Sequence, residues 1–135
     1  MAVIQSFRDL EAWQAAMDLS VRVYSVSMCL PPEERFGLTS QMRRASVSVP
    51  SNVAEGQSHG KNGRYIEHVR VAIGSLGELS TELELARRLK FLSSADLLEV
   101  ERQVVSTRRL LFGLLRSLRK KGLADRAGSQ QRTSD

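Results

Sequence analysis

One run of apolar residues limits the fold more than any other feature of this sequence. Between residues 65 and 86 the apolar side chains recur at alternating steps of four and three residues, without a break. Those steps place them on one face of an α-helix, which turns once every ~3.6 residues. The run consists of Tyr65, Val69, Ala72, Leu76, Leu79, Leu83 and Ala86. We therefore expect a long amphipathic helix that buries this stripe.

Three more segments show helical spacing, and no segment reads as a convincing strand. We expect the first helix over about residues 7–29, because Pro31-Pro32 then stop it. The second helix should start near residue 33, and the last should run from Ser93 or Ser94 to about residue 120. The prediction is an all-α chain of one domain, since 135 residues suffice for one core and are too few to suggest two.

The first of these helices is apolar over more than one face. We expect one row of its side chains to face the core, and a second row lies beside it. The expected core row is Leu10, Trp13, Met17, Tyr24 and Met28, and the second row is Ala12, Ala16, Leu19, Val23 and Val26. The long helix adds Ile66 and Ile73 beside its own stripe. One bundle seam does not bury all of these residues, so we expect the excess to form an interface between copies of the chain.

The stretch RRASVSVPSNVAEG, residues 43–56, has a proline near its centre. We expect the second helix to continue through Pro50 with a kink, at a cost of about 3 kcal/mol, because proline removes an amide donor and crowds the carbonyl of Ser46. The alternative is a true break at Pro50, although Val49 has no side-chain oxygen with which to cap a new helix. Continuity is favoured because one helical phase holds on both sides, at Leu38, Met42, Ala45, Val49, Val53 and Gly56.

A polar stripe accompanies the same segment. Gln41, Ser48, Asn52 and Glu55 recur at spacings of seven, four and three, which places them on one helix face. One interpretation is that they hydrogen-bond to neighbouring helices and to the carbonyl that the proline frees. The other is that they line a shared interface.

Positive charge is concentrated in the C-terminal part of the chain. Residues 1–84 hold 8 Lys and Arg against 10 Asp and Glu, whereas residues 85–135 hold 12 against 5. This asymmetry is typical of proteins with an acidic partner such as nucleic acid. The candidate phosphate-binding residues are Arg108, Arg109, Arg116, Arg119, Lys120 and Lys121, with Arg43 and Arg44. The competing interpretation is a helix end whose cations offset the negative end of the helix dipole.

Beyond Gly122 the sequence LADRAGSQQRTSD is polar, and we expect residues 122–135 to form a disordered tail. The chain has no apolar run of about 18 residues and no secretion signal at its start. We therefore expect a cytoplasmic protein with no membrane partner.

Residues suited to enzyme chemistry are sparse. His59 and His68 do not form the Glu-x-x-His pairs of a di-metal bundle, and the single Cys29 lies among apolar residues. The Glu78 and Glu82 pair falls outside the apolar stripe of its helix, so we expect it on a solvated or intersubunit face. The sequence has no phosphate loop, nucleophile elbow or dinucleotide fingerprint. We expect no catalytic residue, no metal site and no cofactor.

Taken together, these motifs resemble the bacterial four-helix-bundle proteins called 23S rRNA-intervening-sequence proteins. The likeness covers about residues 7–120 and rests on FRDLEAWQAAMDLSVRVY, LPPEERFGLTSQMRRASVSVPSNVAEG and GSLGELSTELELAR. The resemblance implies an antiparallel up-and-down four-helix bundle, here over residues 1–121, and assembly into a ring of five. Relatives of the family include the accessory protein of diversity-generating retroelements, which assists a reverse transcriptase by binding it and nucleic acid.

Two hypotheses about function follow. The first is a non-catalytic homo-oligomeric scaffold, a pentamer by the resemblance, that binds RNA or DNA, or a reverse transcriptase or other nucleic-acid enzyme. The alternative is a scaffold that binds protein partners only. Retention on RNA or DNA that weakens with salt separates the two.

Overall fold

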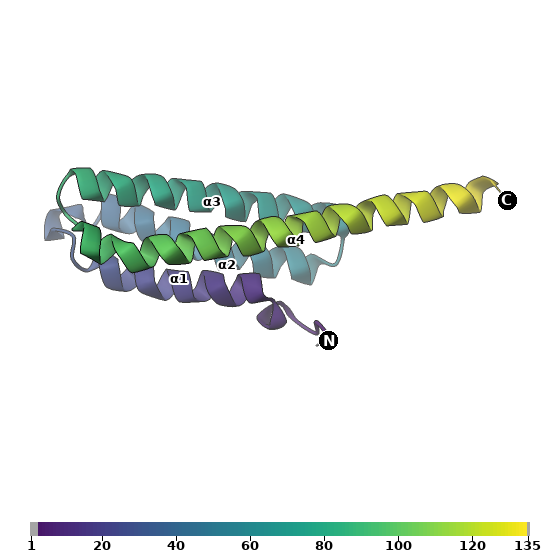
Figure 1. Ribbon diagram of the computed structural model, residues 1–135, viewed down its shortest axis with the longest axis horizontal. Helices are drawn as coiled ribbons and strands as arrows, with labels where there is room; N and C mark the ends of the chain where they lie inside the picture. The colour runs from purple at the N-terminus through teal and green to yellow at the C-terminus, as the bar shows by residue number, and fades with distance from the viewer. Residues whose placement is uncertain (1–2, 135) are drawn as a thin grey trace.

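The computed structural model describes residues 3–134 as four α-helices and two short 3-10 turns (Figure 1). α1 contacts α2 and α4, and α3 also contacts α2 and α4. The four helices therefore lie around one core in the order in which they occur in the sequence. The all-α, antiparallel up-and-down bundle is therefore confirmed. The helices are α1 Glu11–Ser27, α2 Leu38–His59, α3 Asn62–Arg88 and α4 Ser94–Ser134, and the turns are η1 Phe7–Asp9 and η2 Pro32–Glu34.

Two helices begin later than expected, in each case after a 3-10 turn. Ser6 forms a capping box with Asp9, but this box starts η1, and the extended backbone of Leu10 separates η1 from α1. The second expected start, near residue 33, is likewise η2, and α2 begins at Leu38. The expected cap of α4 is present, since the Ser93 hydroxyl accepts a hydrogen bond from the Asp96 amide at 3.1 Å.

The expected stripes of α2 and α3 lie in the core, but the core row predicted for α1 was right only for Leu10 and Trp13, which pack against the core. The buried face of α1 is the row predicted to be excess, Ala12, Ala16, Leu19, Val23 and Val26, whereas Met17, Tyr24 and Met28 are exposed. Ser20 and Ser27 share the buried face, where their hydroxyls bond to backbone carbonyls. Both rows are apolar, and spacing alone does not tell which one faces the bundle.

The helix continues through Pro50, which is buried, so the alternative of a true break was wrong. Proline leaves the carbonyl of Ser46 without its helical donor, and Ser46 is completely buried. The hydroxyl of Ser20 on α1 donates to this carbonyl at 2.9 Å. The freed carbonyl is therefore satisfied by a neighbouring helix and not by the polar stripe of α2 itself.

Gly56 marks the closest approach of α2 to α3. A Cβ atom there would lie 2.9 Å from Cδ1 of Tyr65, 3.0 Å from Cβ of His68 and 3.3 Å from Cα of Tyr65. Because the last of these atoms is backbone, a larger residue would push the two helices apart. Burial in this crossing also raises the pKa of Tyr65 to about 12.

The last helix is longer than expected. α4 continues past residue 120 to Ser134 and projects beyond the other three helices (Figure 1), whereas the sequence predicted a disordered tail over residues 122–135. Asp135 lies outside the described residues. The segment is polar, yet it contains Ala, Arg and Gln, which have high helix propensity without any burial. None of the helices in residues 3–134 is long and apolar enough to cross a membrane.

We expect Ser20→Ala to lower the free energy of unfolding by about 2 kcal/mol, because it leaves the buried Ser46 carbonyl without a donor. The same change should cost clearly less in a Pro50→Ala background, where the new amide of residue 50 can bond to that carbonyl. Urea unfolding of the four proteins at one concentration measures this coupling. Equal costs in the two backgrounds would show that Ser20 acts elsewhere.

We expect Gly56→Ala and Gly77→Ala to change stability in opposite directions. The first should lower the free energy of unfolding by about 1–3 kcal/mol through overpacking against α3. The second places its methyl group where no heavy atom lies within 4 Å, and should raise stability by up to about 1 kcal/mol through helix propensity. Thermal melting followed by circular dichroism compares them, and a higher melting temperature for both would contradict a tight crossing at Gly56.

Candidate nucleic-acid interface

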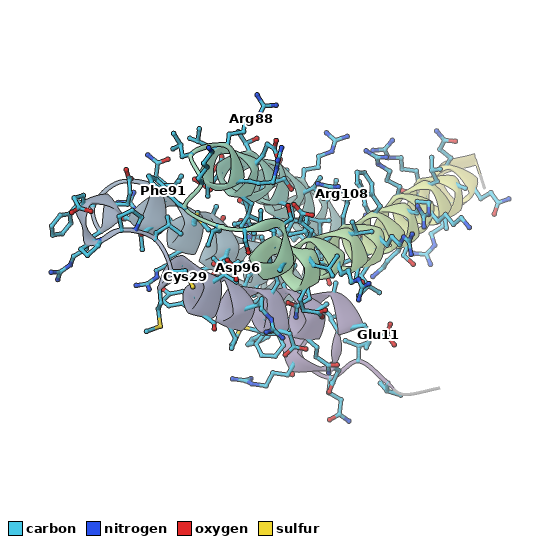
Figure 2. All side chains as sticks on the ribbon, turned by 60° about the vertical axis from the view of Figure 1, so that its left-hand side comes forward. Glu11, Cys29, Arg88, Phe91, Asp96 and Arg108 are labelled. Atoms are coloured by element: carbon cyan, nitrogen blue, oxygen red, sulfur yellow. The ribbon has the colours of Figure 1, made fainter. Side chains whose placement is uncertain are left out.

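The strongest concentration of charge lies at the C-terminal end of α4, where the helix makes its last contacts with the bundle and then projects from it. We call residues 116–134 the basic extension, and its only acidic residue is Asp125. Its cations are exposed, and Figure 2 shows nitrogen-tipped side chains on several sides of this segment. They are Arg116, Arg119, Lys120, Lys121, Arg126 and Arg132.

These cations are not neutralised by neighbours. Within residues 3–134, none of the ion pairs closer than 4.0 Å involves a cation beyond Arg102. Arg87 and Arg88 behave differently, because Glu84 bonds to both at 2.6 and 3.0 Å. These two bonds hold the pKa of Glu84 at about 2. The unpaired positive charge therefore lies on the basic extension and not at the end of α3.

A groove of about 490 Å³ runs between the extension and the start of α3. Asn62 joins the two elements, since its side-chain amide donates to the carbonyl of Leu118 at 3.0 Å. Arg119 and Arg126 line the groove on the α4 side, together with the carboxylate of Asp125, so its lining keeps one net positive charge. The start of α3 has no side-chain cap, so the positive end of its dipole adds to these two cations. The arrangement suits an anionic group such as a phosphate.

The structure does not bring all the predicted basic residues onto one surface. Arg108 is half-buried and approaches the hydroxyl of Ser80 on α3 at 3.5 Å, and Figure 2 labels it away from the projecting segment. Arg109 is exposed and lines another groove, which Leu10 borders. The basic extension therefore keeps only four of the six predicted α4 residues.

Arg43 and Arg44 lie far from the extension. α2 and α4 both run antiparallel to α3, so the start of α2 lies at the end of the bundle opposite the extension. Arg43 donates to the Ser27 hydroxyl at 2.9 Å, and its guanidinium carbon lies 4.7 Å from the centre of the Tyr24 ring. Arg43 thus joins α1 to α2, and Arg44 is exposed beside it.

Two of the polar stripe residues, Ser48 and Asn52, form a hydrogen-bond chain between α2 and α3, and a third, Glu55, lies beside its end. The hydroxyls of Ser48 and Ser75 lie 2.8 Å apart, and the Asn52 amide donates to the Ser48 carbonyl at 2.8 Å. The Asn52 side-chain oxygen is 3.0 Å from Nδ1 of His68, and Glu55 lies 3.6 Å from the same nitrogen. These contacts fit the interpretation that the stripe bonds to a neighbouring helix.

Gln41, the fourth stripe residue, lines a groove of about 440 Å³ together with Arg44, Glu78 and Glu82. Glu82 is half-buried, and its Oε1 atom is inaccessible to solvent with no hydrogen-bond partner among the described residues. Burial and then repulsion from Glu78 raise the pKa of Glu82 to about 7. Sequence reasoning noted the four-residue spacing of the two carboxylates but not the burial of one of them.

The structure also shows an exposed apolar line on α1 that sequence reasoning assigned mostly to the core. It consists of Met17, Tyr24 and Met28, which were predicted to be core residues, and of Val21, which was not. The signal that could have found it is the serine pair Ser20 and Ser27 on the opposite row, whose hydroxyls can bond within a bundle interior. In residues 3–134, no three His, Cys, Asp or Glu side chains lie together as metal ligands would.

Comparison with known proteins bears on the fold and the family. A crystal structure of a protein with unknown function from the S23 ribosomal protein family of Bacteroides thetaiotaomicron superposes with a TM-score of 0.71. The two chains are 17% identical, and the match covers 77% of this chain and 97% of that one, so the likeness shows a shared fold. No curated protein sequence matches the chain. Residues 8–113 match the sequence profile of the 23S rRNA-intervening sequence protein. The chain therefore belongs to the 23S rRNA-intervening sequence protein family.

Proposed function

We propose that the chain is a non-catalytic, homo-oligomeric scaffold of the cytoplasm that binds nucleic acid through the basic extension. One observation carries the proposal: six exposed cations, with no ion pair among the described residues, lie near the end of a helix that leaves the bundle. A helix whose cations have no other partner is free to place them against a phosphate backbone. Release of counterions from that backbone then supplies the binding free energy.

The expected binding is independent of base sequence. Arginine and lysine recognise phosphates as charges, and the extension presents them on several sides of the helix instead of on one edge. The groove beside Arg119 and Arg126 adds a place for a single phosphate near the start of α3. RNA and DNA both offer this chemistry.

Assembly would multiply the effect. The bundle leaves large apolar side chains exposed on α1 and α3, which favours contact between copies, and the family resemblance suggests five of them. In a closed ring every copy points its extension in the same direction. Several extensions on one rim would bind a long phosphate backbone far more tightly than one.

A second candidate function is docking of a protein partner without nucleic acid. Leu98, Val105 and Phe112 are exposed on α4 and recur every seven residues, which is the spacing at which a second helix packs. A reverse transcriptase or another nucleic-acid enzyme is a suitable partner for this line, and so is a protein unrelated to nucleic acid. The two functions can coexist, because the line lies N-terminal to the basic extension.

We expect the protein to bind RNA and DNA with an affinity that falls steeply as salt rises. Changing Arg116, Arg119, Lys120 and Lys121 together to Gln should abolish retention at moderate salt and leave the melting temperature nearly unchanged. If each cation contacts one phosphate of a duplex, the slope of log K against log salt should fall by about 3 to 4. Fluorescence anisotropy with labelled duplexes at several salt concentrations measures both quantities.

The matched control removes the same number of exposed cations elsewhere, at Arg22, Arg35, Arg70 and Lys90, which likewise have no ion pair among the described residues. This variant should keep most of the affinity and the salt slope. Equal weakening by both variants would show that only net charge matters. If the unchanged protein does not bind even at low ionic strength, the protein-only scaffold is the better account.

A further inference from the structure

Two neighbouring faces of the bundle carry exposed apolar side chains that flank a group of charges. The α1–α2 face holds Met17, Val21, Tyr24 and Met28 of α1 with Arg43 and Arg44 of α2. The α2–α3 face holds Val71, Glu78, Glu82 and Leu85 of α3, and Arg44 of α2 borders it as well. Both faces include the exposed side of α2, and within residues 3–134 neither has a partner.

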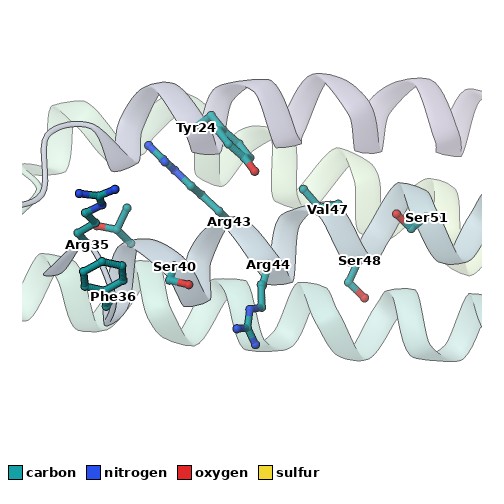
Figure 3. Close-up of a pocket in the computed structure, with 10 residues that line it drawn as sticks. Tyr24, Arg35, Phe36, Ser40, Arg43, Arg44, Val47, Ser48 and Ser51 are labelled. Atoms are coloured by element: carbon teal, nitrogen blue, oxygen red, sulfur yellow. The ribbon is translucent and has the colours of Figure 1, made fainter.

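The α1–α2 face is positively charged. Its groove of about 590 Å³ is lined by arginines, hydroxyls and the aromatic rings of Tyr24 and Phe36, and by no carboxylate among the described residues (Figure 3). Phe36 is 87% exposed at one end of the groove. The ring adds to the exposed apolar side chains of α1 beside the groove, and contiguous exposed apolar patches are typical of contact surfaces.

The α2–α3 face has the opposite charge. Glu78 and Glu82 lie four residues apart on α3, and Oε1 of Glu82 has no hydrogen-bond partner although solvent does not reach it. A Cβ atom at Gly74, on the same helix, would meet no heavy atom within 4 Å. Arg44 of α2 borders the same groove, so the face carries two carboxylates beside one cation and keeps a negative balance, with space for another backbone to approach.

Hydrogen bonds show that the charges on the two faces lie at the same level along the bundle. The contact between Ser48 and Ser75 aligns α2 with the antiparallel α3, so Glu78 lies level with about residue 45 of α2 and Glu82 with about residue 41. Arg43 falls between these two levels. Tyr24 shares the level of Arg43, because the guanidinium lies over its ring.

The apolar residues match in the same way. Val71 and Leu85 each lie seven residues from Glu78, about 10 Å along the helix in opposite directions. Met17 and Met28 flank Tyr24 on α1 and fall near the levels of Val71 and Leu85 respectively. Each face thus has apolar residues at both ends and charged residues at its centre. The central charge is positive on the α1–α2 face and negative on the α2–α3 face.

We infer that the α1–α2 face of one copy docks on the α2–α3 face of the next, with Arg43, which lines only the first of these grooves, against Glu78 and Glu82. The inference rests on the assembly in the proposed function and names its contact surfaces. When copies are related by rotation about an axis parallel to the helices, residues at the same height along the bundle face each other. The positive centre of one face then lies against the negative centre of the next. Docking either face on its own copy would instead set like charges against each other.

The arrangement also has a geometric consequence. A contact between two different faces repeats head to tail, and faces at an angle to each other make the chain of copies curve. Both faces include α2. Repeated docking therefore forms a closed ring of copies in which α2 of each copy lies nearest the ring axis. α4 has no contact with α2 and lies at the opposite corner, so it occupies the outside of the ring with its basic extension uncovered.

The experiment uses one carboxylate on each face. Val21→Glu alters only the α1–α2 face and Val71→Glu only the α2–α3 face, and these valines are 69% and 52% exposed, so the bundle should still fold. Each variant alone should sediment with the mass of one 15.1 kDa chain, whereas the unchanged protein sediments as a larger assembly. An equal mixture should sediment at twice the single-chain mass, because each variant contributes one intact face.

Val105→Glu is the matched control, since this valine is 45% exposed on α4 and belongs to neither face, so it should keep the mass of the unchanged protein. Circular dichroism checks helicity, and Met28→Glu or Leu85→Glu replaces a variant that unfolds. Either face variant retaining the full assembly would overturn the inference, as would a mixture that stays at the single-chain mass. A single-chain mass for the unchanged protein would refute the proposed assembly itself.

Discussion

The bundle depends on how α2 is accommodated as it passes through Pro50. The proline leaves a fully buried carbonyl at Ser46, and α1 supplies the missing donor through Ser20. Two residues further along α2, Ser48 contacts Ser75 and so sets the position of α3. One short stretch of α2 therefore aligns both of its neighbours. A shift of either helix along α2 would leave a buried polar group without a partner.

This alignment explains why the family motif lies where it does. Ser48, Asn52 and Gly56 all serve the contact between α2 and α3, the first two through hydrogen bonds and the last through its missing side chain. The outward side of the same helix borders both charged grooves. A motif that looks like a binding site in sequence thus acts first in packing, and it positions the surfaces on either side of it.

Predictability differed between helices for a physical reason. α2 and α3 each have one continuous apolar stripe, and burial of that stripe leaves no second solution. α1 has two apolar rows, so periodicity identified the helix but not its inner face. The decision came from Ser20 and Ser27, which are polar in sequence but bond to backbone inside the bundle. The sequence did not predict that α4 continues beyond Gly122. A polar composition indicates that a segment is exposed, but it says little about whether the segment is helical.

The sequence by itself determined the all-α class, the four helices, the continuity of α2 across Pro50 and the excess of positive charge near the C-terminus. These features depend on local spacing and composition. Only the tertiary structure decided which row of α1 is exposed, and that Arg43 lies at the end of the bundle opposite Arg116. It also placed Glu82 in a groove where one oxygen has no partner. Such features depend on the levels at which helices meet, and those levels are set by side-chain contacts between segments distant in sequence.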